Sequence, residues 1–250
     1  MKKVVITGAA DGIGKATAIA CVEAGFFVIA ADKDRLGLQH LQKILPFHRL
    51  ETHLADFSCA SVYQSFIGAL YDKFNHRTLH ALVNNPGLYH GKSVYEYRDG
   101  EMEKDWAINL KSLVSLSRDF ARRERSSASL NESGRALRSI VNLTSVVAEP
   151  ASMDALYAAA KAGVIGTTKA NAWNFAPYVR VNAVAPGLVR NISVDDRIPD
   201  CRGAEYARQE IPREPITPDG IADVVMFLLS DQSRHLNGRV IAVDNGACPR

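Results

Sequence analysis

The sequence has little cysteine and no dense group of metal-binding side chains. Its four cysteines, Cys21, Cys59, Cys201 and Cys248, stand far apart in the 250 residues, with no C-x-x-C pair and no histidines at metal-ligand spacing. This spacing argues against a zinc site and against a disulfide framework. We therefore expect no bound metal and thiols that stay reduced in the cell.

Long apolar runs and an excess of charge of one sign are also missing. The apolar run after Lys2 and Lys3 ends at Thr7, too early for a signal peptide, and no other run is long enough for a transmembrane helix. The 30 Lys and Arg and 27 Asp and Glu are spread along the chain, with no basic block. We expect a cytoplasmic protein with neither a membrane nor a nucleic-acid partner.

Short β-branched runs alternate with longer amphipathic segments along the whole chain. The runs are VVIT (4–7), FFVIAA (26–31), LETHL (50–54), LHALV (79–83), SIVNLT (139–144), VRVNAVA (179–185) and RVIAV (239–243). Such alternation predicts an α/β fold with a doubly wound, seven-stranded parallel sheet and helices on both faces. No linker or repeat interrupts it, so we expect one domain over residues 1–250.

Two segments depart from the alternation. Residues 122–138 are polar and rich in Gly and Ser, which predicts a helix end followed by a surface loop. Residues 188–216 are irregular and carry three prolines and many charges. Because inserted segments at the carboxyl end of a strand often cover a ligand, we interpret 188–216 as a substrate cover.

A glycine-rich turn follows the first predicted strand. In TGAADGIG, Gly8, Gly12 and Gly14 precede a helix that starts near Ile13, and Asp11 lies within the turn. Glycines permit a tight turn and let backbone N–H groups approach a pyrophosphate at the positive end of a helix. The position of this turn after the first strand predicts a dinucleotide site.

The second predicted strand ends in AADKD, with Asp32 about 20 residues beyond the glycine turn. A carboxylate there accepts hydrogen bonds from the adenosine ribose hydroxyls and repels a 2′-phosphate, so NAD is favoured over NADP. Lys33 is the one neighbour that favours the phosphorylated cofactor. The alternative is that Asp32 caps the next helix.

The stretch YAAAK places two reactive groups on an alanine-rich helix. Tyr157 and Lys161 are four residues apart and therefore share one helix face. A nearby cation favours tyrosinate, which would lower the pKa of the phenol toward neutral pH.

Six motifs stand in one order along the chain: TGAADGIG, VNNPG, INLKS, VNLTS, YAAAK and VNAVAPG. In order and spacing the sequence resembles the short-chain dehydrogenase/reductase family over essentially its whole length. The resemblance implies a Rossmann fold and a catalytic tetrad. Tyr157 would be the general acid/base, Lys161 would lower its pKa and bind the nicotinamide ribose, Ser145 would bind the reacting oxygen, and Asn109 would hold a water of the proton relay.

The resemblance also implies further cofactor contacts. Asp56 would bind the adenine amino group beside the Phe57 backbone, although Asp56 could instead be a simple helix cap. Asn84 and Gly87 would line the inner ribose. The full set of predicted cofactor residues is Gly8, Asp11, Gly12, Ile13, Gly14, Asp32, Lys33, Asp56, Phe57, Asn84, Pro86, Gly87, Tyr157, Lys161, Pro186, Gly187, Val189 and Asn191.

Three positions depart from the family pattern. Pro86 replaces the usual alanine, which removes a backbone N–H and restricts the residue before it. Asn191 stands where the family has a threonine that contacts the nicotinamide carboxamide. Asn245 replaces a glycine of the C-terminal motif, and we expect it in a left-handed turn.

The sequence favours an NAD-dependent oxidoreductase acting on a secondary alcohol or ketone. Two alternatives stay open, an NADPH-dependent carbonyl reductase of a biosynthetic pathway acting on a carrier-bound acyl chain, and a non-catalytic dinucleotide-binding regulator. The substrate is expected between segments 88–98, 146–154 and 188–213, which carry Tyr89, His90, Lys92, Arg190, Arg197 and Arg213. By resemblance we expect a homodimer or homotetramer that packs through the helices near 101–123 and 154–175.

Overall fold

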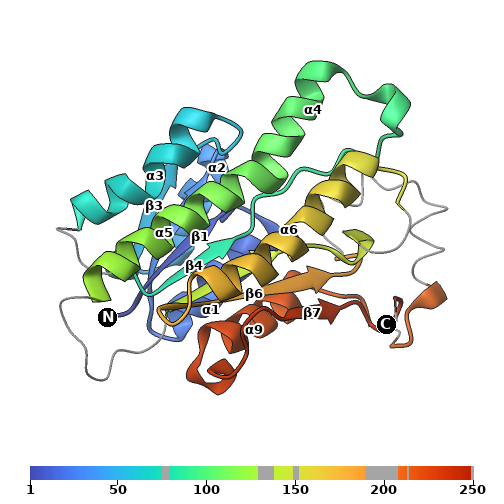
Figure 1. The fold of residues 1–250 in the computed structure, drawn as a ribbon. Coiled ribbons are helices and arrows are strands. Elements are labelled where there is room, and N and C mark those ends of the chain that lie inside the picture. Colours follow the sequence, from blue (N-terminus) through green and yellow to red (C-terminus); the bar gives the residue numbers. More distant parts are fainter. Residues whose placement is uncertain (75–78, 129–137, 149–151, 190–207, 213, 249–250) are drawn as a thin grey trace.

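The fold is a seven-stranded parallel sheet between two layers of helices (Figure 1). The computed structural model describes all residues except 75–78, 129–137, 149–151, 190–207, 213 and 249–250. The strands are β1 (Lys3–Thr7), β2 (Phe27–Asp32), β3 (Leu50–Leu54), β4 (Ala81–Asn84), β5 (Arg138–Leu143), β6 (Val179–Pro186) and β7 (Val240–Val243). Their spatial order is β3-β2-β1-β4-β5-β6-β7. Each predicted strand is present, with its ends within two residues of the prediction.

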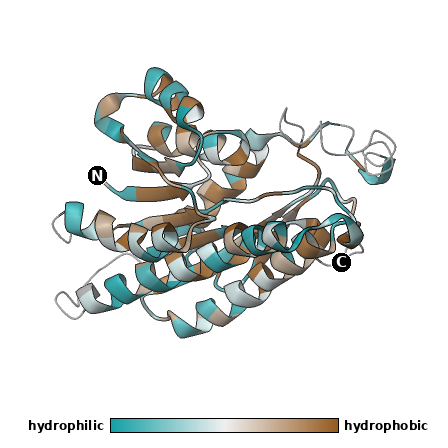
Figure 2. Cartoon of the chain, turned by 90° about the horizontal axis from the view of Figure 1, so that it is seen from above, coloured by the Kyte–Doolittle hydropathy of each residue, from teal (hydrophilic) through white to brown (hydrophobic). Residues whose placement is uncertain are grey.

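Helices cover both faces because consecutive strand residues point to opposite sides. Val4 and Ile6 pack toward α1 (Gly12–Glu23), α2 (Arg35–Ile44) and α9 (Pro218–Leu229). Val5 of the same strand packs into the other layer, which contains α3 (Ala60–Lys73), α5 (Ser112–Ala128) and α6 (Ala155–Asn174). Figure 2 shows the apolar strands between helices whose outer faces are hydrophilic. The predicted doubly wound class is confirmed.

α4 (Asp99–Trp106) runs into α5 through five residues of π-helix, Ala107–Lys111. Such a bulge adds a residue to the helix and often marks a functional position. Short 3-10 turns lie at Phe47–Arg49, Val94–Glu96, Val146–Ala148 and Asp231–Ser233. α5 ends at Ala128, within the segment 122–138 where a helix end was predicted, and the loop expected after it lies outside the described residues.

A buried ion pair joins α5 to β5. Arg138 Nε donates to Glu124 Oε2 at 3.0 Å, and the hydroxyl of Tyr71 from α3 donates to the other carboxylate oxygen. Glu124 is only 1% exposed. The charge of this carboxylate is therefore satisfied from two neighbouring elements, which fixes α5 against both β5 and α3.

Several smaller expectations can be compared with the structure. Cys21 and Cys59 are not joined in a disulfide. Asn245 has φ +52°, the left-handed conformation expected for it. Among the described residues, no helix combines the length and apolar character that crossing a membrane requires.

Candidate active site

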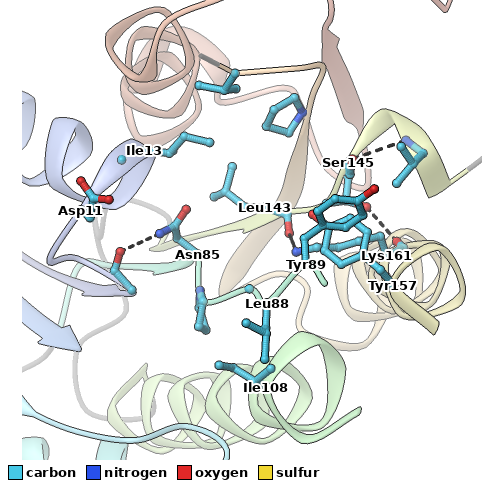
Figure 3. Close-up of a pocket in the computed structure, with 18 of the residues that line it drawn as sticks. Asp11, Ile13, Asn85, Leu88, Tyr89, Ile108, Leu143, Ser145, Tyr157 and Lys161 are labelled. Carbon is cyan, nitrogen blue, oxygen red and sulfur yellow. Dashed lines mark hydrogen bonds between the residues drawn. The ribbon is translucent and has the colours of Figure 1, made fainter. Parts of the chain in front are cut away.

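The strand order reverses between β1 and β4, and a cavity of about 710 Å³ opens where the carboxyl ends of these strands meet. This switch point is where open α/β sheets bind ligands. The cavity runs from Asp11 and Asp32 at one end to Ser145 and Tyr157 at the other. Figure 3 shows Asp11 and Tyr157 on opposite sides of it.

The glycine turn forms one wall of the cavity. Gly8, Asp11, Gly12 and Ile13 line it, whereas Gly14 is buried behind the turn. A Cβ on Gly14 would lie 1.9 Å from the carbonyl oxygen of Gly8, so only glycine lets α1 approach β1 here. Asp11 is the N-cap of α1 but makes no side-chain cap bond, so the first N–H groups of this helix are not capped by it.

Asp32 ends β2 at the cavity and is held by backbone. Its Oδ2 accepts from Ala10 N at 3.0 Å and its Oδ1 from Asp34 N at 3.0 Å. The cap of α2 is Asp34, which accepts from Leu36 N at 2.9 Å, so the alternative that Asp32 is the helix cap is wrong. Each Asp32 oxygen keeps further acceptor capacity toward the cavity, which Lys33 also lines.

Asp56 follows β3 and lies in the cavity wall. Its Oδ1 accepts from the Ser58 backbone N at 2.9 Å and from the Ser58 hydroxyl at 2.8 Å. Burial pushes the pKa of Asp56 up, but these bonds and the charges of Lys33 and Lys104 outweigh it, so the pKa lies below its usual value. The N-cap of α3 is Cys59 rather than Asp56.

The neighbouring Phe57 side chain belongs to the core. It is 3% exposed, and its ring packs edge-on to Phe66 with centroids 5.3 Å apart. Phe57 also lines the cavity.

Asn84, like Gly14, is a predicted cofactor residue that does not line the cavity. Its Nδ2 donates to Asn142 Oδ1 at 2.9 Å and to Ser117 Oγ at 3.0 Å, so the side chain lies inside the sheet and against α5, not in the cavity lining. Asn85, which was not predicted, lines the cavity and donates its amide to Gly8 O at 2.8 Å. Pro86 and Gly87 line the cavity as well.

Tyr157 lies in the first turn of α6. Asp154 caps this helix by accepting from Tyr157 N at 3.0 Å. The Tyr157 ring meets the ring of Tyr89 edge-on at 5.1 Å. Burial raises the pKa of Tyr157 to about 12, against a lowering effect of the nearby Ser145 side chain and with smaller raising contributions from Tyr89 and Asp154. In the protein alone the pKa is thus higher than usual, and the predicted lowering is not found.

Lys161 lies one turn further along α6 and is 3% exposed. Its Nζ donates to Leu143 O at 2.9 Å and lies 5.4 Å from the centre of the Tyr157 ring. Burial lowers the pKa of Lys161 to about 8. Thr144 points away from the reacting groups, since its hydroxyl donates to Lys161 O at 2.7 Å.

Asn109 lies in the π-helical segment and is 1% exposed. Its Oδ1 accepts from Leu88 N, and its Nδ2 donates to Leu88 O. A Cβ on Gly87 would lie 3.4 Å from Lys161 Nζ and 3.5 Å from Asn109 Oδ1, so the three residues converge. Asn109 does not line the cavity itself. In the structure, its side chain fixes the backbone of Leu88 in the segment that follows β4.

The remaining predicted contacts lie near the end of β6. Pro186, Gly187 and Val189 line the cavity, and Val189 forms a β-bridge with Ile216. Asn191 and most of the expected cover 188–216 lie outside the described residues, as do Arg190, Arg197 and Arg213. His90 and Lys92 do not line the cavity but pair with Asp105 and Glu101.

Asp154 is a functional position that motif reasoning missed. An aspartate three residues before Tyr157, at the start of an apolar helix, is a helix N-cap signal that the sequence does carry. Within the described residues, no group of three or more His, Cys, Asp or Glu side chains has the arrangement of a metal site.

Comparison with known proteins agrees with this geometry. Residues 8–248 match the family model described as enoyl-(acyl carrier protein) reductase. The chain is 31% identical to a 3-oxoacyl-[acyl-carrier-protein] reductase of Thermotoga maritima, covering 98% of this chain and 97% of that protein. It is 30% identical to a 2-keto-3-deoxy-L-fuconate dehydrogenase of Xanthomonas campestris, covering 98% and 79%.

The fold is shared with solved structures of the same kind. The crystallised 4-hydroxyisoleucine dehydrogenase, complexed with NADH, superposes with a TM-score of 0.88 at 26% identity, and 100% of both chains is covered. The switch-point cavity, the glycine turn and the Ser145, Tyr157 and Lys161 cluster therefore occur in a chain that matches these enzymes from end to end. The protein belongs to the short-chain dehydrogenase/reductase family and is an oxidoreductase.

Proposed function

We propose that this enzyme transfers a hydride between NAD(H) and a secondary alcohol or ketone, with Tyr157 as general acid/base. The observation that carries the proposal is the convergence of Tyr157, Ser145 and Lys161 at one end of a cavity whose other end is formed by the glycine turn and Asp32. One continuous cavity thus contains both a wall suited to binding a dinucleotide and a group that can transfer a proton.

The residues present fit a nicotinamide dinucleotide. The glycine turn leaves room for a pyrophosphate at the start of α1, and Asp32 keeps acceptor capacity for ribose hydroxyls. The cavity is also lined by Asp56, Asn85, Pro86 and Gly187. When bound, the nicotinamide supplies or accepts the hydride.

The chain's own groups handle the proton and the oxygen. In ketone reduction, the Ser145 hydroxyl and the Tyr157 hydroxyl hold the carbonyl oxygen, and Tyr157 gives its proton to that oxygen as the hydride arrives at carbon. Lys161, fixed on Leu143 O, places a positive charge beside the phenol and stabilises the tyrosinate that remains. In alcohol oxidation, the same groups work in reverse and Tyr157 takes the hydroxyl proton.

NAD is the proposed cofactor because Asp32, Asp34 and Asp11 all line the adenosine end of the cavity. These carboxylates would repel a 2′-phosphate. Lys33 lines the same end, and the similarity to a 3-oxoacyl reductase keeps NADPH and a carrier-bound acyl substrate as the second candidate. A regulator without catalysis is disfavoured, because the chain has every side chain that proton transfer needs.

Two experiments test the proposal. Titration with NADH and with NADPH, followed by nicotinamide fluorescence, should show tighter binding of NADH, and Asp32→Ala should reduce the difference. Tyr157→Phe should abolish turnover of ketones while NADH binding stays near that of the wild type, because the phenol hydroxyl moves the proton. Turnover retained by Tyr157→Phe would contradict the assignment.

We further propose a cytoplasmic homodimer or homotetramer. The exposed residues of α6 include the small Ala159, Ala162, Gly166 and Ala170, together with Lys169 and with Trp173, which is 86% exposed. An exposed tryptophan beside small residues suits packing against a second copy. Light scattering of the purified protein tests this, and Trp173→Asp should shift the protein toward the monomer.

A further inference from the structure

The charged side chains of the cavity lie mainly at one end. Asp11, Asp32, Lys33, Asp34 and Asp56 line the part formed by the glycine turn and the ends of β2 and β3. At the Tyr157 end, the charged side chain of the described lining is Lys161, whose Nζ is already bonded to Leu143 O. Among the described residues of the lining, a substrate therefore meets little charge around its reacting carbon.

Apolar and aromatic groups form the described wall around Ser145 and Tyr157. Val146 and Val147 follow Ser145, Met153 precedes the helix that carries Tyr157, and Leu88 and Tyr89 face them from the chain after β4. In Figure 3, Tyr89 lies directly beside Tyr157, with Leu88 and Ile108 further along the same side. This wall suits an uncharged substituent on the substrate.

Tyr89 is the most specific element of this wall. Its ring meets the Tyr157 ring edge-on, at 5.1 Å between centroids and 70° between planes, and both side chains are only partly buried. An aromatic face is therefore presented next to the hydroxyl that would move the proton. Edge-to-face and offset packing of a third ring on such a pair adds binding energy beyond the area buried.

The nearby cations do not offer a partner for a substrate carboxylate. His90 Nε2 lies 3.1 Å from Asp105 Oδ1, and Lys92 Nζ lies 3.1 Å from Glu101 Oε1. Both basic side chains are therefore already bonded to acidic partners outside the cavity.

Negative charge also lies buried behind the wall. Asp154 is 0% exposed and Asp105 is 1% exposed. The oxygens of Asp154 accept from Tyr157 N, Gly91 N and the Tyr97 hydroxyl. The Asp154 carboxylate, whose charge acts on the Tyr157 phenol, disfavours an anionic group there.

From this distribution we infer that the substrate is uncharged next to its carbonyl or carbinol carbon and carries an aromatic ring that packs on Tyr89. The inference rests on the proposed function and deepens it, since it names the substrate class of the same site. Tyr89 is then a specificity-determining residue, whereas Tyr157 carries out the proton transfer.

Four ketones that differ only in charge and ring provide the test. They are ethyl 3-oxobutanoate, the 3-oxobutanoate anion, ethyl 3-oxo-3-phenylpropanoate and the corresponding phenyl carboxylate, each reduced with NADH. We expect each ester to exceed its carboxylate in kcat/KM by about tenfold or more, and the phenyl ester to exceed the methyl one. Equal or better reduction of the carboxylates would overturn the inference while leaving the proposed function intact. Absence of turnover with all four would contradict the proposed function and remove this inference with it.

Tyr89→Leu tests the role of the ring directly. The phenyl-to-methyl ratio of kcat/KM for the two esters should fall about three- to tenfold, mainly through KM, because an aromatic contact is lost while Tyr157 stays in place. Tyr89→Phe should keep the ratio. Tyr95→Leu is the matched control, since Tyr95 is 95% exposed and lies outside the cavity. An unchanged ratio in Tyr89→Leu would refute the assignment of Tyr89.

Discussion

Replacing Asp154 should disturb both stability and catalysis, because this buried carboxylate joins three segments. It accepts from Tyr157 N at 3.0 Å, from Gly91 N at 3.2 Å and from the Tyr97 hydroxyl at 2.8 Å. Loss of an N-cap costs about 0.5–2 kcal/mol. Each buried donor left without a partner costs a further ~1–3 kcal/mol. Because Tyr97 is partly exposed, we expect Asp154→Ala to lose about 3–5 kcal/mol of unfolding free energy.

Urea unfolding measures this loss, and thermal unfolding provides a second reading. In a protein of this size, 1 kcal/mol corresponds to roughly 2–4 °C in melting temperature, so Asp154→Ala should melt about 6 °C or more below the wild type. Asp154→Asn is the matched control, because asparagine caps helices as well as aspartate does and keeps one acceptor. A loss below about 1 kcal/mol in Asp154→Ala would refute the three-way role.

The same pair of variants separates positioning from charge. The Asp154 carboxylate helps to raise the pKa of Tyr157, so its neutral replacement should lower that pKa. In Asp154→Asn, the pH at which alcohol oxidation becomes active should therefore shift downward relative to the wild type. A merely structural residue would leave the pH profile unchanged.

Three further substitutions, the last with a matched control, address the core, Lys161 and the glycine turn. Glu124→Gln should cost about 3–5 kcal/mol in urea unfolding, because it removes the charge of one member of a buried ion pair. Lys161 loses its proton near pH 8 in the folded protein and near pH 10.5 in the unfolded chain. Because the unfolded chain binds the extra proton between these pH values, the unfolding free energy of the wild type should rise by about 3 kcal/mol across that interval. Lys161→Met should lack this rise. Gly14→Ala should prevent stable folding or NADH binding because its Cβ would lie 1.9 Å from Gly8 O, whereas Gly100→Ala, with nothing within 4 Å, should be tolerated.

The strands and the glycine turn were predictable because their signals are local. Period, β-branching and bounding glycines suffice to define a run such as VVIT before Gly8. The direction in which a single side chain points at a strand end depends instead on contacts with distant parts of the chain. Asn84 pairs in register with Asn142 of β5, and that pairing turns its amide into the sheet and leaves Asn85 at the cavity.

The cap of α2 shows the same limit at shorter range. Asp32 and Asp34 both stand before this helix, and composition alone does not choose between them. The choice depends on Ala10, whose N–H binds Asp32 Oδ2 from the glycine turn and so holds that carboxylate at the cavity. Asp34 is then left to accept from Leu36 N. A contact 22 residues away in sequence thus decides which aspartate serves the site.

The pKa values of the catalytic pair could not be read from their spacing. The i, i+4 arrangement predicts that Lys161 favours tyrosinate, but it does not include the cost of burying both groups. In the folded chain, burial favours the neutral form of each, raising the pKa of Tyr157 to about 12 and lowering that of Lys161 to about 8. At neutral pH, Tyr157 therefore holds its proton and Lys161 its charge. Those are the states that ketone reduction requires, because the phenol must donate a proton and the ammonium must stabilise the tyrosinate left behind. Alcohol oxidation, by contrast, must begin by removing the same proton from Tyr157.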